Sequence, residues 1–148
     1  MQADIQKILL VEDNPNDAEL TLEALNEKNL ANEVLWLRDG QEALDFLYCR
    51  EAYAGREPVN PVLILLDIKM PRVDGLQVLK EVKGDPRLRT IPVVILTSSR
   101  EEADLIEGYS YGVNAYVVKP VNFNDFMHSV SSLGAFWAVL NEAPPIQI

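Results

Sequence analysis

The sequence predicts an α/β fold in which a doubly wound, five-stranded parallel sheet is covered on both faces by five helices. Short apolar runs alternate five times with longer segments that repeat apolar residues at helical spacing. Each helical segment opens with a pair of residues typical of a helix N-terminus. One run, 62–66, has no polar position, as expected of a strand buried on both faces.

Each expected strand is a short, mainly apolar run that ends at a polar or charged residue. The five expected strands are 7–11, 33–37, 62–66, 92–96 and 115–118. The first helix is expected from Asn14 to Leu25, because Asn14 can cap it and Pro15 suits the first helical position. Asp17 stands where a capping box places its acid, and Asp39, with an acid three residues later, opens the second helix.

The second half of the chain continues the alternation after an unusually long polar connection at 49–61. Three further cap pairs open the remaining helices: Asp74 with Gln77, Ser99 with Glu102, and Asn122 with Asp125. The apolar stripe of the last helix consists of Phe126, Val130, Leu133, Trp137 and Leu140. This order is that of a flavodoxin-like (βα)5 fold. We expect residues 1–148 to form a single domain with no output domain.

The amino-acid composition limits the kinds of partner that the protein is expected to bind. The net charge is −10, from 13 Lys and Arg against 23 Asp and Glu. An acidic surface disfavours duplex nucleic acid and anionic membranes as partners, because both require a cationic patch. A single cysteine, Cys49, cannot form an internal disulfide, which suits the cytoplasm. No apolar run is long enough to span a membrane, and no signal peptide precedes the first strand.

The ends of the expected strands carry the chemistry. In a parallel sheet all carboxyl ends meet at one edge, and this edge would collect Glu12, Asp13, Asp67, Thr97 and Lys119. Clustered carboxylates resist ionising together, and an oxygen-only set is what Mg²⁺ prefers. No His or Cys stands at these ends, which argues against zinc. A lysine and a hydroxyl beside such a metal suit a phosphoryl group, and a carboxylate can be the nucleophile that accepts it.

The chain resembles the receiver domains of response regulators in bacterial two-component signalling. The resemblance lies in Leu10-Val-Glu-Asp13, Asp67-x-x-Met-Pro-x-x-Asp-Gly75, Leu96-Thr-Ser98 and Lys119-Pro120. Intervals of 30 residues from Asp67 to Thr97 and 22 from Thr97 to Lys119 are those of the family.

The resemblance implies a role for each matching residue. Asp67 would accept a phosphoryl group from a phosphohistidine on a sensor histidine kinase, with Thr97 and Lys119 binding that group. The implied magnesium ligands are Asp13 directly, Glu12 through water, Asp67, and the backbone carbonyl of Lys69. Tyr116 occupies the family's aromatic switch position, and the Lys119–Pro120 peptide bond would be cis. Such a protein is a switch rather than an enzyme, although it assists its own phosphorylation and dephosphorylation.

Three further features are similar to the single-domain regulators that partner bacterial phytochromes. They are the 49–61 connection, the segment from Pro92 to Ser99, and Phe136-Trp137. A phytochrome kinase is therefore an expected partner. Phe136 also widens the apolar stripe of the last helix, and this surface predicts a homodimer through that helix and Phe136/Trp137.

Other interpretations of these residues stay open. Taken singly, each acid, Thr97 or Lys119 is an ordinary strand-end or surface residue. A magnesium-dependent aspartyl-phosphate phosphohydrolase commonly has a second acid two residues after its nucleophile, but Lys69 stands there. No glycine-rich phosphate loop follows the first strand, which disfavours a nucleotide-binding domain. A phosphorylation-independent protein-binding module would not need the complete acid, threonine and lysine set.

Overall fold

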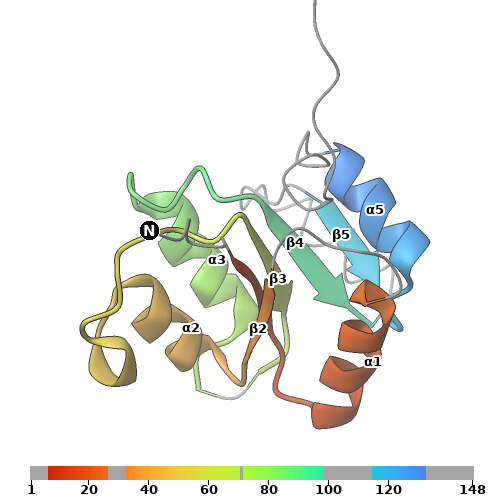
Figure 1. Cartoon of the computed structure of the whole chain (residues 1–148), viewed down its shortest axis with the longest axis horizontal. Helices are drawn as coiled ribbons and strands as arrows, with labels where there is room; N and C mark the ends of the chain where they lie inside the picture. Colours follow the sequence, from red (N-terminus) through yellow and green to blue (C-terminus); the bar gives the residue numbers. More distant parts are fainter. Residues whose placement is uncertain (1–6, 27–32, 71, 99–114, 133–148) are drawn as a thin grey trace, which may run out of the picture.

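A computed structural model describes residues 7–26, 33–70, 72–98 and 115–132. One sheet of five parallel strands has the order β2-β1-β3-β4-β5 (Figure 1). The strands are β1 (Lys7–Val11), β2 (Glu33–Leu37), β3 (Leu63–Asp67), β4 (Val93–Thr97) and β5 (Ala115–Val118). The order reverses between β1 and β3, since β1 lies between β2 and β3, and open α/β sheets bind ligands at such a switch point.

Strands β3 and β4 each begin and end one residue later than the sequence predicts. Asp67 is therefore the last residue of β3 and pairs with Leu96, and Thr97 is the last residue of β4 and pairs with Val118. The predicted strand ends were wrong by this one residue because the ladder continues past the apolar run. The N–H of Lys119 donates to the carbonyl of Thr97 at 2.8 Å, which extends the pairing further.

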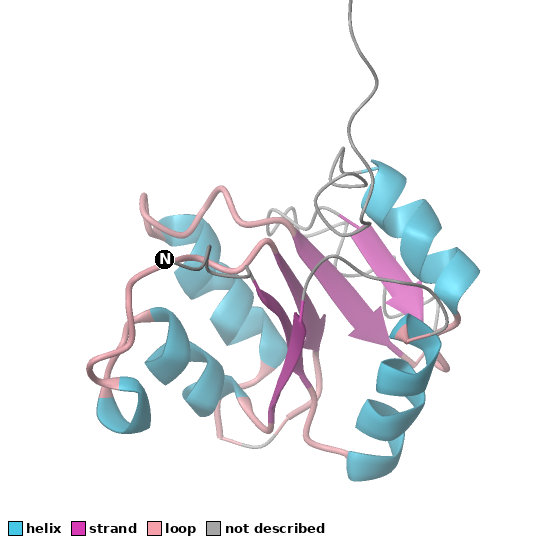
Figure 2. Cartoon of the chain, viewed as in Figure 1, coloured by secondary structure: helices cyan, strands magenta, loops and turns pink. Residues whose placement is uncertain are grey.

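Helices cover both faces of the sheet, as the predicted doubly wound fold requires. The described helices are α1 (Pro15–Leu25), α2 (Gly40–Leu47), α3 (Gly75–Gly84) and α5 (Phe123–Ser132), with a short 3-10 helix, η1 (Glu51–Tyr53). Helices α2 and α3 lie on one side of the sheet and α1 and α5 on the other (Figures 1 and 2). The predicted helix opened by Ser99, and the part of the last helix beyond residue 132, lie outside the described residues.

The predicted cap residues begin the described helices. The side chain of Asn14 accepts from the N–H groups of Asn16 and Asp17, and Asp39 accepts from Glu42. Asp74 and Gln77 form a reciprocal capping box at the start of α3. At α5, the side chain of Asn122 accepts from the N–H of Asp125 at 2.8 Å. Each contact satisfies a backbone donor that the helix itself leaves free.

The core has two layers, one on each face of the sheet. Leu9, Val11, Ile64 and Leu66 pack under α2 and α3, and alternate residues of the same strands pack under α1 and α5. Every residue of β3 is buried, as predicted for a strand covered on both faces. The described strand ends are consequently held in a rigid frame, which matters for the groups that they carry.

The long 49–61 connection is folded against α2 by Arg56. Its guanidinium donates from Nε and Nη2 to the carbonyl of Phe46, at 3.0 and 2.8 Å, and lies 3.9 Å from the centre of the Phe46 ring. From Nη1 it donates to the carbonyls of Glu57 and Val59. One arginine therefore donates to three carbonyl groups, one in the last turn of α2 and two in the connection.

Candidate functional site

The carboxyl edge of the sheet brings the predicted residues together. Glu12 and Asp13 follow β1, Asp67 ends β3, Thr97 ends β4, and Lys119 follows β5. The register is continuous across these strands, because Val11 pairs with Leu66, Asp67 with Leu96, and Thr97 with Val118. The ends of these adjacent strands thus place carboxylates, a hydroxyl and an ammonium at one edge of the sheet.

Three carboxylates form a cluster at the switch point. Oxygens of Glu12, Asp13 and Asp67 lie within 4.8 Å of one another. Glu12 is fully buried, Asp67 is 6% exposed, and Asp13 is open to solvent. Oxygen Oε1 of Glu12 has no hydrogen-bond donor, although it lies in an ion pair with Lys119. All the metal-binding atoms that this cluster offers are oxygens, and the buried Glu12 oxygen can still accept a hydrogen bond from a water molecule. Both properties fit a hard divalent cation that carries bound water.

The ammonium of Lys119 lies among three carboxylates. Its Nζ is 2.6 Å from Oε1 of Glu12 and 3.2 Å from Oδ2 of Asp67. A third contact, 3.1 Å long, reaches Oδ2 of Asp17 on α1. The Lys119 side chain is only 14% exposed, so these contacts are partly shielded from water. The Lys119–Pro120 bond is cis, as the resemblance implied.

These contacts shift the pKa values of two of the groups. The pKa of Glu12 is raised to about 7, mainly by burial and also by the neighbouring Asp67, although the Lys119 charge lowers it in part. Burial alone would lower the pKa of Lys119, but its carboxylate neighbours outweigh this and raise that pKa above its ordinary value. Lys119 therefore stays charged, whereas Glu12 accepts a proton easily unless another cation joins it.

The backbone around Asp67 is arranged by the start of α3. Oδ1 of Asp67 accepts from the N–H of Lys69 at 3.3 Å, while Oδ2 faces Lys119. Gly75 donates its N–H to the carbonyl of Ile68 at 2.8 Å. A Cβ on Gly75 would lie 2.2 Å from the carbonyl oxygen of Asp67. The close approach explains the glycine. Pro71, which belongs to the same sequence motif, lies outside the described residues.

The remaining predicted residues have these positions. Thr97 is buried at the end of β4, one strand from Asp67. Tyr116 is half-buried in β5 and packs against the core layer under α2 and α3. The side chain of Lys69 is exposed at the mouth of the site. The aromatic switch role of Tyr116 and the metal role of the Lys69 carbonyl remain predictions. Phe136 and Trp137 lie outside the described residues.

Sequence reasoning missed two residues that the structure adds to this site. Asp17 was predicted to be the acid of a capping box with Asn14, but the N–H of Asn14 donates to Glu12 and the Asp17 carboxylate contacts Lys119. Trp36 donates from Nε1 to the carbonyl of Glu12 at 2.7 Å and so fixes the turn that follows β1. Neither contact has a local sequence signal, because each joins segments far apart in the chain.

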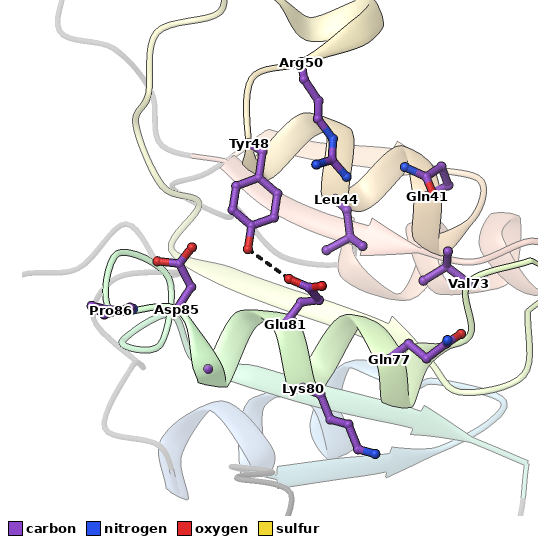
Figure 3. A pocket seen from close by; sticks show the side chains of 11 residues that line it. Gln41, Leu44, Tyr48, Arg50, Val73, Gln77, Lys80, Glu81, Asp85 and Pro86 are labelled. Carbon is purple, nitrogen blue, oxygen red and sulfur yellow. Dashed lines mark hydrogen bonds between the residues drawn. The ribbon is translucent and has the colours of Figure 1, made fainter.

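A groove of about 870 Å³ lies elsewhere, between α2 and α3 (Figure 3). Tyr48 crosses it and donates to Glu81 at 3.1 Å, with Asp85 close by in the same view. Burial raises the pKa of Tyr48 to about 12, and Glu81 adds to the effect. None of the predicted site residues lines this groove. This groove is therefore separate from the cluster at the carboxyl edge.

The described helices include none that is both long and apolar enough to cross a membrane.

Comparisons with known proteins agree with the site. The family model described as response regulator receiver domain matches residues 8–131. The probable methanogenesis regulatory protein FilR2 of Methanothrix harundinacea is 42% identical over 137 residues, covering 93% of this chain and 86% of the relative. Response regulator Rcp1 of Synechocystis sp. is 42% identical over 130 residues, covering 88% of this chain and 87% of the relative.

Solved structures give the same result. The bacteriophytochrome response regulator AtBRR is 58% identical with a TM-score of 0.88, over 95% of this chain and all 100% of that one. The Mn²⁺-bound form of response regulator Rcp1 is 40% identical with a TM-score of 0.70, over 90% of this chain and 94% of that one.

Proposed function

This chain belongs to the response-regulator receiver family, and we propose that it is a phosphorylation-dependent switch with Asp67 as the phosphoacceptor. The observation that supports this most is the environment of the Asp67 carboxylate. One of its oxygens faces the Lys119 ammonium at 3.2 Å, and the other accepts from the Lys69 N–H. It also lies beside two further acids at the switch point of the sheet.

Phosphoryl transfer would proceed by in-line attack of an Asp67 carboxylate oxygen on the phosphorus of a phosphohistidine. The new Asp67 O–P bond forms as the N–P bond of the donor breaks, and the departing imidazole nitrogen keeps the electron pair and takes up a proton. Lys119 offsets charge on the phosphoryl oxygens, and the Thr97 hydroxyl donates to one of them.

Magnesium fits the donor set of this site. Asp13 and Asp67 would bind the ion directly, Glu12 through water, and the backbone carbonyl of Lys69 would complete the protein ligands. When bound, the ion neutralises charge that the carboxylates and the phosphoryl oxygens would otherwise bring too close together. The raised pKa of Glu12, about 7, is the property expected of an acid that needs such a cation to ionise fully.

The switch would work through Thr97 and Tyr116. Movement of the Thr97 side chain toward the phosphoryl group would vacate space into which the Tyr116 ring turns. The surface around β5 and α5 would then change its affinity for a partner. Phosphorylation has this effect only to the extent that it stabilises one arrangement over the other.

The donor that we propose is a sensor histidine kinase of the phytochrome type. AtBRR is described as a bacteriophytochrome response regulator, and its likeness to this chain supports that class of partner. We further propose that the chain acts in the cytoplasm as a receiver domain. Homodimerisation through the last helix and Phe136/Trp137 is part of the same proposal, with light scattering as its test.

Intact-protein mass spectrometry tests the proposed function. The wild-type protein and Asp67→Asn are each mixed with Mg²⁺ and phosphoramidate, a small phosphodonor. We expect one phosphoryl group on the wild type, labile to hydroxylamine, and none on Asp67→Asn. Full labelling of Asp67→Asn would contradict the assignment. Release of many equivalents of phosphate per protein would instead favour a phosphohydrolase, and partner binding unaffected by phosphorylation a plain binding module.

A further inference from the structure

The carboxylate of Asp17 connects α1 to the site. It accepts from the Lys119 ammonium at 3.1 Å, and the two residues are 102 positions apart in the chain. Asp17 lies in the first turn of α1, but its side chain completes no capping box there, because the N–H of Asn14 donates to Oε2 of Glu12 instead. The contact is a charge-assisted hydrogen bond between two elements that the sheet alone would not join.

The Lys119 ammonium donates to Asp17 and Asp67 and forms an ion pair with Glu12. An ammonium has three N–H donors. Three carboxylates surround it, with Nζ–O distances of 2.6 Å to Glu12, 3.1 Å to Asp17 and 3.2 Å to Asp67. A phosphoryl oxygen on Asp67 therefore competes for the Lys119 ammonium with the carboxylates that already surround it.

The three carboxylates differ in how easily each can break its contact with Lys119. The Glu12 side chain is 0% exposed, the Asp67 side chain 9%, and the Asp17 side chain 37%. Separating Glu12 from Lys119 would leave a buried charge without a partner, which is strongly unfavourable. Asp67 carries the phosphoryl group itself. Asp17 can exchange the ammonium for water, since it is already partly hydrated.

We propose that Asp17 is a releasable partner of Lys119 that competes with the phosphoryl group for its ammonium and so stabilises the unphosphorylated state. The proposal rests on Asp67 being the phosphoacceptor and adds a residue that sets the balance between the two states. Like-charge repulsion between Asp17 and the phosphoryl group acts in the same direction. Release of Asp17 also frees the first turn of α1 from Lys119.

Asp17→Asn tests this competition, because it removes the charge with little change of shape. Glu19→Gln is the matched control, since Glu19 is an exposed acid on the same helix. The rate of phosphorylation by phosphoramidate with saturating Mg²⁺ is followed by intact mass. Affinity for beryllofluoride, a phosphoryl mimic, is measured by calorimetry. We expect Asp17→Asn to increase both by about fivefold, in the range found for contacting charged groups, with Glu19→Gln close to wild type.

A double-mutant cycle separates competition from simple repulsion. In a Lys119→Ala background there is no ammonium to compete for, so only the repulsion remains and Asp17→Asn should increase the phosphorylation rate clearly less than it does in the wild-type background. Equal effects in both backgrounds, or slower phosphorylation of Asp17→Asn, would overturn the proposal. Asp17→Glu keeps the carboxylate and is expected to behave more like the wild type.

The outcomes also separate this proposal from the proposed function. A wild-type protein that gains no phosphoryl group on Asp67 would contradict the function itself. A wild type that is phosphorylated on Asp67 at the same rate as Asp17→Asn would contradict only the role of Asp17.

Discussion

The ammonium of Lys119 lies 2.6 Å from a Glu12 carboxylate that is fully buried. The pair is asymmetric, since Lys119 keeps its charge while burial raises the pKa of Glu12 to about 7. Without a metal ion, the carboxylates of the site therefore outnumber its single ammonium, and a divalent cation would supply the missing positive charge.

Stability without metal should fall as the pH rises through neutrality. The unfolded chain binds the Glu12 proton with a pKa near 4.5 and the folded chain with one of about 7, so the folded state gains stability below pH 4.5. That gain is lost as the pH rises toward 7. In chelator-containing buffer, we expect a loss on the order of 2–3 kcal/mol relative to Glu12→Gln, which lacks this titration. Urea unfolding at pH 5 and pH 8 measures it. Parallel pH profiles for the two proteins would contradict the raised pKa.

Magnesium should stabilise the fold, and Asp13 should be required for the effect. Asp13 is exposed, so Asp13→Asn removes a ligand without disturbing the core. At a free Mg²⁺ concentration of about 100 times Kd, one site adds roughly 2.7 kcal/mol to the free energy of unfolding. We expect this gain in the wild type and in Glu23→Gln, an exposed acid of α1 away from the cluster. Thermal unfolding of each protein with and without Mg²⁺ measures this gain in stability. An equal gain in Asp13→Asn would place the ion elsewhere.

Gly75 and Gly84, at the two ends of α3, should respond in opposite ways to alanine. A Cβ on Gly75 would meet the Asp67 carbonyl oxygen at 2.2 Å, whereas nothing lies within 4 Å of one on Gly84. Gly75→Ala must displace the phosphoacceptor strand or α3, with an expected loss of about 1–3 kcal/mol. Gly84→Ala should be neutral or stabilising by up to about 1 kcal/mol. Denaturant unfolding compares them, and phosphorylation of the folded Gly75→Ala protein should also be slower.

Most of the carboxyl edge could be predicted from the sequence, because a parallel sheet collects all strand ends on one side. The apolar run before Asp67 identified a buried strand, and β3 is buried at every residue. The boundaries of β3 and β4 were less predictable, since the ladder extends into polar residues such as Thr97. Apolar patterning records burial and does not record where backbone pairing stops.

The roles that could not be predicted from the sequence depend on contacts between residues far apart in the chain. The position of Asp17 in the first turn of a helix suits a cap as well as a contact outside the helix. Only the placement of Lys119, after β5, decides between them. The same holds for Gly75, whose role depends on how closely α3 approaches the end of β3. In both cases the role of the residue depends on a neighbour that is distant in the sequence. Sequence spacing predicts which edge of the sheet the two share, but it does not predict that they are in contact.

Arg56 should be required for the folded form of the 49–61 connection but not for phosphorylation. Its guanidinium donates to the carbonyls of Phe46, Glu57 and Val59 and stacks on the Phe46 ring, a combination that lysine cannot reproduce. We expect Arg56→Lys to lower the free energy of unfolding by about 1–3 kcal/mol, because carbonyl groups lose their donors. Amide exchange should speed up in the connection, while the phosphorylation rate at Asp67 stays unchanged, since Arg56 contacts none of the edge residues. Arg89→Lys, a substitution at an exposed position, controls for the general effect of the exchange. Hydrogen exchange by mass spectrometry locates the change, and slower phosphorylation of Arg56→Lys would show that the connection is coupled to the site.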